Sequence, residues 1–176
     1  NEAALYIEAD GKVRIAYEGK GRTREQLRSY YAASEVPNIY VSAPMLIDNF
    51  NPVGESFAGF YSEDAMTKFN YEDYVHHQGV RHPRTVVAST ADDHLLLIVV
   101  DGRRDGISEG MSVRELTRFL VTNFNPQYAI NMDGGGSTTL CVEGQGDPNT
   151  HVVNYPSGSP RMDHGGERSL YSFICL

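Results

Sequence analysis

Three glycines follow a carboxylate in the segment INMDGGGSTTL, residues 130–140. The residues that can do chemistry here are Asp133, Gly134, Gly135, Gly136 and Ser137. Because glycine has no Cβ, such a run lets a ligand approach backbone N–H groups that bind anions or hydroxyls. A carboxylate at this place can serve as acid, base or nucleophile at a glycosidic carbon. A tight turn between two strands is the alternative. The run lacks the lysine of a Walker loop and the spacing of a dinucleotide fingerprint.

Three other segments place arginine, glycine and carboxylate at the ends of expected elements. They are RHPRTVVAS (81–89), DGRRDGISEG (101–110) and MDHGGERS (162–169), with the candidates Arg84, Thr85, Asp101, Arg103 and Arg168. The planar guanidinium of arginine can donate two hydrogen bonds to a phosphate. Arginines together with carboxylates therefore indicate a sugar that carries a phosphate diester. The structural alternatives are an ion pair at a strand end for Arg84 and a plain turn for Asp101.

The pattern of residues 95–133 predicts how two carboxylates meet. Two apolar strands end in Asp101 and Asp133, and a helix with a capping box of Ser112 and Glu115 lies between them. If both strands belong to one sheet, they are parallel and end at the same edge, where such sheets bind ligands. Strand alternation places Asn131 on the face of Asp133, where it can orient the acid or bind a hydroxyl.

The remaining elements predict an α+β fold: a central mixed β-sheet with a βαβ crossover at about 95–133 and flanking helices. The expected elements are a hairpin around Asp10-Gly11, a helix at 23–34, one buried strand at 38–48, a short helix at 62–69 within the irregular region 49–83, a strand at 85–90, and strands at 138–144 and 168–176.

The bulk composition limits the possible partners. The chain has 176 residues, enough for one domain, and its formal net charge of −8 argues against a nucleic-acid surface and an anionic membrane. No apolar run reaches the roughly 20 residues of a membrane helix, so we expect no membrane insertion. The two cysteines, Cys141 and Cys175, are either buried thiols or one disulfide.

The histidines His76, His77, His82 and His164 do not predict a metal site, because adjacent histidines in a strand or loop point apart. We expect no metal and no cofactor. A Ca²⁺ ion held by Asp and backbone carbonyl oxygens stays open as an alternative.

The chain resembles the phosphodiester glycosidase family. The segments that carry the resemblance are HPRTVVAS, LLIVVDGR with GISEGMSVRELTRFL, YAINMDGGGSTTLCV, and NYPS with ERSLYSFICL, in the family's order from about Arg81 to Leu176. The resemblance implies hydrolysis of a sugar-1-phosphodiester between the anomeric carbon and the phosphate oxygen, which leaves free sugar and a phosphomonoester. It also implies an extracytoplasmic location.

The resemblance further implies which residues act. Asp133 and Asp101 would be catalytic, and the residues that bind substrate and phosphate would be Arg84, Thr85, Arg103, Asn131, Gly134, Gly135, Gly136, Ser137 and Arg168. The chain departs from the family pattern at Ser89, where glycine is usual, and at Ser169, where proline is frequent. Residues 1–80 contain no upstream glycine- and aromatic-rich motif. We therefore expect one domain over 1–176 that lacks the N-terminal part of the family domain, and we keep a non-catalytic module for glycan or anionic polymer as the alternative. The sequence fixes neither the sugar, the aglycone nor the oligomeric state.

Overall fold

The computed structural model describes residues 2–57, 61–66, 74–165 and 167–175. The described strands form two sheets. One has the order β2 (Val13–Ala16), β1 (Ala3–Ile7), β3 (Asn38–Ser42), and the other has the order β4 (Met45–Asp48), β7 (Tyr128–Asn131), β5 (Arg84–Ser89), β6 (Leu95–Val100). The described helices are α1 (Arg24–Ala32), α2 (Glu63–Met66), α3 (Tyr74–Gly79) and α4 (Val113–Asn123), with 3₁₀ turns at Val53–Ser56 and Gly135–Ser137. The predicted α+β fold is confirmed.

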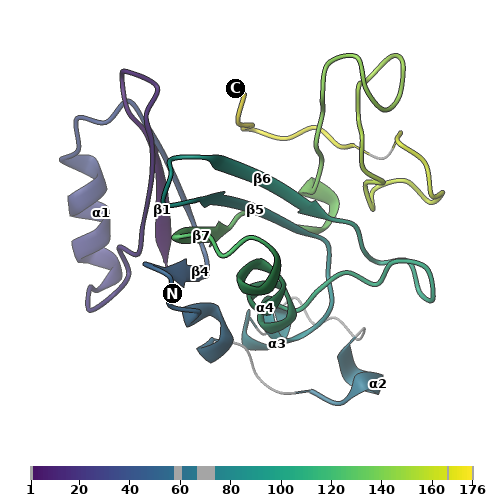
Figure 1. Cartoon of the computed structure of the whole chain (residues 1–176), viewed down its shortest axis with the longest axis horizontal. Coiled ribbons are helices and arrows are strands. Elements are labelled where there is room, and N and C mark those ends of the chain that lie inside the picture. The colour runs from purple at the N-terminus through teal and green to yellow at the C-terminus, as the bar shows by residue number, and fades with distance from the viewer. Residues whose placement is uncertain (1, 58–60, 67–73, 166, 176) are drawn as a thin grey trace.

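The two sheets pack against each other, α4 covers the far face of the four-stranded sheet, and α1 lies beside β1 (Figure 1). Strand alternation divides the apolar residues between two cores. Leu5 and Ile15 of one sheet meet Val87 and Ile130 of the other. On the opposite face, Val86 packs with the apolar side of α4. The four-stranded sheet is therefore held from both sides, which gives the loops at its edge a rigid base.

The segment from β6 through α4 to β7 forms the predicted strand–helix–strand unit. Ser112 caps α4 in a capping box with Glu115, as the sequence predicts. Strands β6 and β7 both pair antiparallel with β5, so they run parallel to each other with β5 between them. The expectation of a mixed sheet is wrong, because the neighbouring strands of this sheet pair antiparallel. Strand β5 forms a hairpin with β6 and lies between β6 and β7.

Three other expectations need correction. The single strand at 38–48 is two strands, β3 and β4, in different sheets, because the chain changes sheet at Ala43–Pro44, where proline cannot donate a ladder hydrogen bond. The segment 138–144 has only an isolated bridge, between Cys141 and Val152. Residues 168–175 pair with no described strand. Of the expected helix at 62–69, Glu63–Met66 is helical and residues 67–69 lie outside the described residues.

Both expectations for the cysteines are wrong as well. Cys141 and Cys175 are exposed and free, neither buried nor joined in a disulfide. The physical reason is local. Each cysteine lies in a segment that the sequence pattern assigns to a strand but that runs outside the two sheets, so its side chain faces solvent.

Candidate active site

The candidate residues gather at one edge of the four-stranded sheet. Because β5 runs opposite to β6 and β7, the start of β5 lies at the same edge as the ends of its two neighbours. Arg84 pairs with Val100, and the Met132 N–H donates to the Thr85 carbonyl at 2.8 Å. Asp101 and Asp133, which follow β6 and β7, therefore emerge at the edge where β5 begins.

Three glycines enclose the backbone of His82 and Pro83 just before β5. A Cβ on Gly102 would lie 2.8 Å from the Pro83 nitrogen, one on Gly134 would lie 2.6 Å from the Pro83 carbonyl oxygen, and one on Gly110 would overlap the His82 backbone. Gly102 and Gly110 come from the loop between β6 and α4, and Gly134 comes from the loop after β7. Close backbone packing explains why a side chain is excluded at Gly134, and it fixes these two loops against the segment before β5.

The next two glycines lie against arginines. Gly135 has a φ of +62°, and a Cβ there would lie 2.8 Å from Nη2 of Arg103. A Cβ on Gly136 would lie 3.5 Å from Nε of Arg168. Arg168 also donates to Ser137 Oγ at 2.6 Å. Two exposed guanidinium groups thus approach consecutive glycines of one loop, so the loop carries concentrated positive charge.

Asp133 stands at the mouth of this loop. Its side chain is exposed, and Oδ1 accepts a hydrogen bond from the Gly134 N–H at 2.9 Å. Asp133, Ser137, Arg168 and Thr85 all line a cavity of about 600 Å³. The cavity therefore brings together a carboxylate, a guanidinium and two hydroxyl groups from the predicted site.

Asp101 has a different environment, although it lies at the same edge. Its carboxylate accepts from Nδ2 of Asn154 at 2.9 Å and from the Tyr155 N–H at 3.1 Å. Asn154 also donates to the Thr138 carbonyl at 3.0 Å. Asp101 is not among the described residues that line the cavity. These contacts give it a structural task, which is to hold the 154–155 segment beside the glycine loop, and its catalytic role stays a prediction.

Arg84 is buried beneath the site, with 1% of its surface exposed. Its Nε donates to the Met111 carbonyl at 2.9 Å, and its Nη2 donates to the carbonyls of His77 at 2.9 Å and Val80 at 3.1 Å. Burial, together with the charge of Arg103, lowers the pKa of Arg84 to about 10. Phosphate binding by Arg84 stays a prediction, and the contacts show a side chain that ties α3 to the loop before α4.

The polar residues next to the carboxylate also have partners. Asn131 is buried, and its Nδ2 donates to the carbonyls of Ala43 at 3.0 Å and Met132 at 2.9 Å. It therefore joins the end of β7 to the turn before β4, and orientation of Asp133 by Asn131 stays a prediction. Thr85 donates from Oγ1 to Thr138 Oγ1 at 3.2 Å, which ties β5 to the end of the glycine loop.

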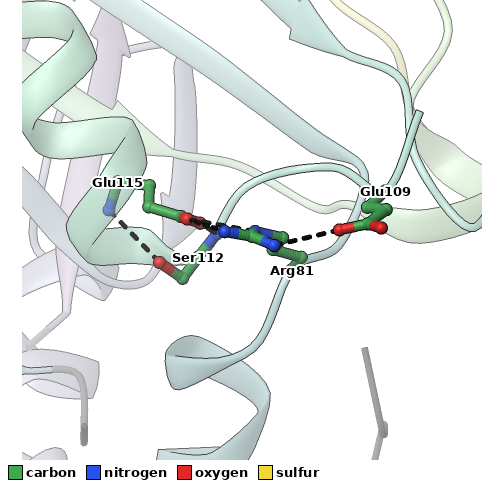
Figure 2. A network of polar contacts seen from close by, with 4 residues as sticks. All are labelled: Arg81, Glu109, Ser112 and Glu115. Atoms are coloured by element: carbon green, nitrogen blue, oxygen red, sulfur yellow. Dashed lines mark hydrogen bonds and ion pairs between the residues drawn. The ribbon is translucent and has the colours of Figure 1, made fainter. Parts of the chain in front are cut away.

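An arginine that the sequence does not single out anchors the loop that carries Arg103. Arg81 donates to Glu115 at 2.7 and 3.0 Å and to Glu109 at 3.0 Å (Figure 2). Glu115 is also the reciprocal partner of Ser112 at the start of α4 (Figure 2). Arg81 thus joins the start of α4, the loop 101–111 and the segment before β5. The spacing from Arg81 to two distant glutamates gives no sequence signal for this network.

His77 and His82 also belong to the site, although the sequence analysis considers them only as metal ligands and rejects them. The rings of His77 and His82 meet edge to face with centroids 4.6 Å apart. His82 also lies beside Nη2 of Arg103, 3.4 Å from Nδ1. Burial, then the charges of Arg84 and Arg103, lower the pKa of His77 to about 4 and of His82 to about 2. Both rings are therefore neutral at pH 7. The sequence signal that could have indicated His82 as a site residue is its position directly before Pro83 at the start of a strand.

We expect the stability of the fold to fall as the pH drops below about 6.5. His82 resists protonation in the folded state but takes up a proton near pH 6.5 when unfolded, so the unfolded state binds more protons in this range. The stability contributed by neutral His82 is present above pH 6.5 and is lost as the pH falls toward about 2. Chemical unfolding from pH 7 to 4.5 should show this slope, and His82→Asn should flatten it. An equally steep slope in His82→Asn would contradict the assignment.

Comparison with known proteins identifies the family of this chain. The family model for phosphodiester glycosidases matches residues 1–176. The chain belongs to the phosphodiester glycosidase family. No curated protein sequence matches the chain.

Two solved structures are similar to this glycosidase-family chain. The catalytic domain of zebrafish N-acetylglucosamine-1-phosphodiester α-N-acetylglucosaminidase, auto-inhibited by its pro-peptide, has a TM-score of 0.57 and 23% identity, and the match covers 88% of this chain and 45% of that one. A Burkholderia pseudomallei K96243 protein, whose name proposes that it is exported, has a TM-score of 0.47 and 20% identity, with 94% and 38% covered. The present chain thus spans less than half the length of either structure. The first match supports the fold.

The described part of this family member contains no group of three or more His, Cys, Asp and Glu side chains placed to hold a metal ion. The expectation of catalysis without a metal or cofactor stays a prediction, and so does the alternative of Ca²⁺. His164, another of the rejected ligands, stacks on Tyr155 instead. Among the described helices, none combines the length and apolar character needed to span a bilayer.

Proposed function

We propose that this chain hydrolyses a sugar-1-phosphodiester at the bond between the anomeric carbon and the phosphate oxygen. The observation that carries the proposal is the glycine loop, which holds Asp133 at one end and lies against Arg103 and Arg168. Its family membership adds support. The zebrafish relative is named for the same reaction on an N-acetylglucosamine phosphodiester, so a GlcNAc-1-phosphodiester is the substrate to test first. An extracytoplasmic location is part of the proposal.

The two exposed arginines would bind the phosphate. They approach consecutive glycines of one loop, and an anion bound there would accept charge-assisted hydrogen bonds from their guanidinium groups. The N–H groups of Gly134, Gly135 and Ser137 donate to Asp133 or to backbone carbonyls. The loop therefore contributes its shape and the Ser137 hydroxyl, and the arginines supply the charge.

Asp133 would act as the general base in our mechanism. It takes a proton from water as the water oxygen bonds to C1, while the C1–O bond breaks and its electron pair stays on the phosphate oxygen. The products are free sugar and a phosphomonoester. Phosphate is a good leaving group, so this scheme requires no strong general acid. Because water displaces the phosphate at C1 in a single step, this scheme predicts inversion at the anomeric centre.

Hydrolysis of GlcNAc-1-phospho-methylmannoside in ¹⁸O-water tests the proposal directly. We expect free GlcNAc and methylmannoside phosphate without ¹⁸O in its phosphate group, because water attacks carbon rather than phosphorus. The label in the phosphate would show cleavage at phosphorus and would contradict the proposed bond. No release by folded protein at high concentration would contradict the proposed activity.

Substitution of either phosphate-binding arginine should weaken substrate binding. A charge-assisted hydrogen bond contributes about 1.5–3 kcal/mol, so Arg103→Met or Arg168→Met should raise KM by about 10-fold or more. Arg118→Met is the matched control, because Arg118 is an exposed arginine on α4 that pairs with Glu55. Steady-state kinetics at two salt concentrations measures the effect. An unchanged KM in both site variants would remove the arginines from the site.

The second candidate function is non-catalytic binding of a glycan or an anionic polymer. The observation that favours it is the position of Asp101, whose two carboxylate oxygens accept from the Tyr155 N–H. Asp133 is then the single carboxylate that lines the cavity among the described residues. A binding module would show saturable binding of the substrate without product.

A further inference from the structure

The cavity at the glycine loop continues into an apolar half that the proposed reaction does not use. Its polar half contains Asp133, Ser137 and Arg168, and its more apolar half lies between the β5–β6 hairpin and the segment 169–174. The volume of about 600 Å³ falls within the roughly 300–1,000 Å³ that small-molecule sites occupy. A phosphate, a sugar carbon and something further can therefore share one site.

The sheet supplies one apolar wall through strand register. Thr85 pairs with Val99 and Val87 pairs with Leu97, so these four side chains lie on one face of the hairpin. Further along this face, Val87 and Leu95 belong to the core between the two sheets. The cavity begins where that core ends. Leu97, at 38% exposure on the edge strand β6, is the apolar side chain that this core leaves uncovered.

The second wall is the segment that the sequence predicts to be the last strand. Tyr40 donates to the Phe173 carbonyl at 3.3 Å, and Ile174 packs on the core between the sheets. The segment is therefore anchored near its end, and it begins at Arg168 beside the glycine loop. Between these points Tyr171 and Phe173 are exposed, Phe173 at 79%. Leu170, Phe173 and Ile174 line the cavity along this path, with Ser169 and Ser172 between them in the sequence.

From this continuity we infer that the substrate is a glycosyl phosphodiester of an apolar alcohol, whose alkyl or aromatic aglycone lies between β6 and residues 170–174. The inference rests on the proposed function. With the phosphate held at Arg168 and C1 at Asp133, the second ester oxygen leads into the apolar half of the cavity. An apolar aglycone gains by burial against the valine, leucine and phenylalanine side chains there. A polar aglycone would find few side-chain partners besides hydroxyls such as those of Ser169 and Ser172.

Paired substrates test the inference. The octyl and methyl esters of GlcNAc-1-phosphate share sugar, phosphate and scissile bond, and differ in seven methylene groups. Each buried methylene gives up to about a 4-fold gain, and partial burial of the chain leads us to expect kcat/KM at least about 30-fold higher for the octyl ester. Concentrations stay below micelle formation. Free GlcNAc is measured for both.

Matched variants locate the apolar wall. Leu97→Thr should lower the ratio of kcat/KM for the octyl ester to kcat/KM for the methyl ester several-fold. Val121→Thr is the control, because Val121 is 37% exposed on α4 and does not line the cavity. Phe173→Ser, on the opposite wall, should act like Leu97→Thr.

The outcomes separate the two proposals. Equal kcat/KM for both esters overturns the apolar aglycone and leaves the phosphodiester glycosidase in place. No hydrolysis of either ester by folded protein overturns both. A dimer that Leu97→Thr dissociates, together with no octyl preference, identifies a second copy of the chain as the occupant and also overturns the inference.

Discussion

Asp133→Asn is expected to lower kcat by at least about 100-fold while the protein stays folded. General-base catalysis contributes roughly 10²–10⁴ to a rate, and Asp133 is the one carboxylate among the described residues that lines the cavity. Asparagine keeps an oxygen that can accept from the Gly134 N–H, so the loop should retain its conformation. Release of GlcNAc from the methyl phosphodiester measures the rate.

Two control variants make that result specific. Asp105→Asn changes an exposed carboxylate in the turn after Arg103 and Arg104, and should leave kcat unaltered. Asp101→Asn should lower both activity and thermal stability, because its new amide group must replace a carboxylate that accepts from Asn154 and Tyr155. Full activity in Asp133→Asn would exclude Asp133 as the base. A loss confined to Asp101→Asn at unchanged stability would move catalysis to Asp101.

The sequence predicts which residues meet at this edge of the sheet better than it predicts the role of each residue. Apolar periodicity and the Ser112 capping box define β6, α4 and β7, and those elements fix where Asp133 emerges. The position of β5 between β6 and β7 depends on which strands pair over long range, and local patterns do not contain that information. Without that long-range information, the sequence analysis expects a mixed sheet, whereas the described strand pairs are all antiparallel.

Local patterns also miss which polar groups are buried. Arg84 and Arg168 look equivalent in the sequence, as arginines near strand ends, but one is buried beneath α3 and the other is exposed at the cavity. The burial of Arg84 follows from the packing of α3 and the 109–111 loop over the start of β5. The C-terminal segment shows the opposite case: its apolar pattern is typical of a strand, yet residues 168–174 line a cavity without joining either sheet.

Arg84→Met is expected to destabilise the fold by about 3 kcal/mol or more. The guanidinium donates to the carbonyls of Met111, His77 and Val80, and each buried acceptor that loses its partner costs about 1–3 kcal/mol. Methionine fills much of the space but donates nothing. For a domain of this size, 3 kcal/mol corresponds to a fall in Tm of about 6–12 °C. Thermal unfolding monitored by circular dichroism measures the change.

The comparison of Arg84 with Arg103 separates a structural arginine from a phosphate ligand. Arg103→Met removes an exposed guanidinium beside Gly135, so Tm should stay nearly constant while KM rises. Arg84→Met should lower Tm, and its KM at a temperature where the protein is still folded should change little. Arg84→Lys retains the charge and part of the hydrogen bonding, and should fall between wild type and Arg84→Met in Tm. If Arg84→Met instead kept its Tm and lost affinity for the phosphodiester, Arg84 would bind phosphate as the family resemblance implies, and the loops at this edge would have to open further when substrate binds.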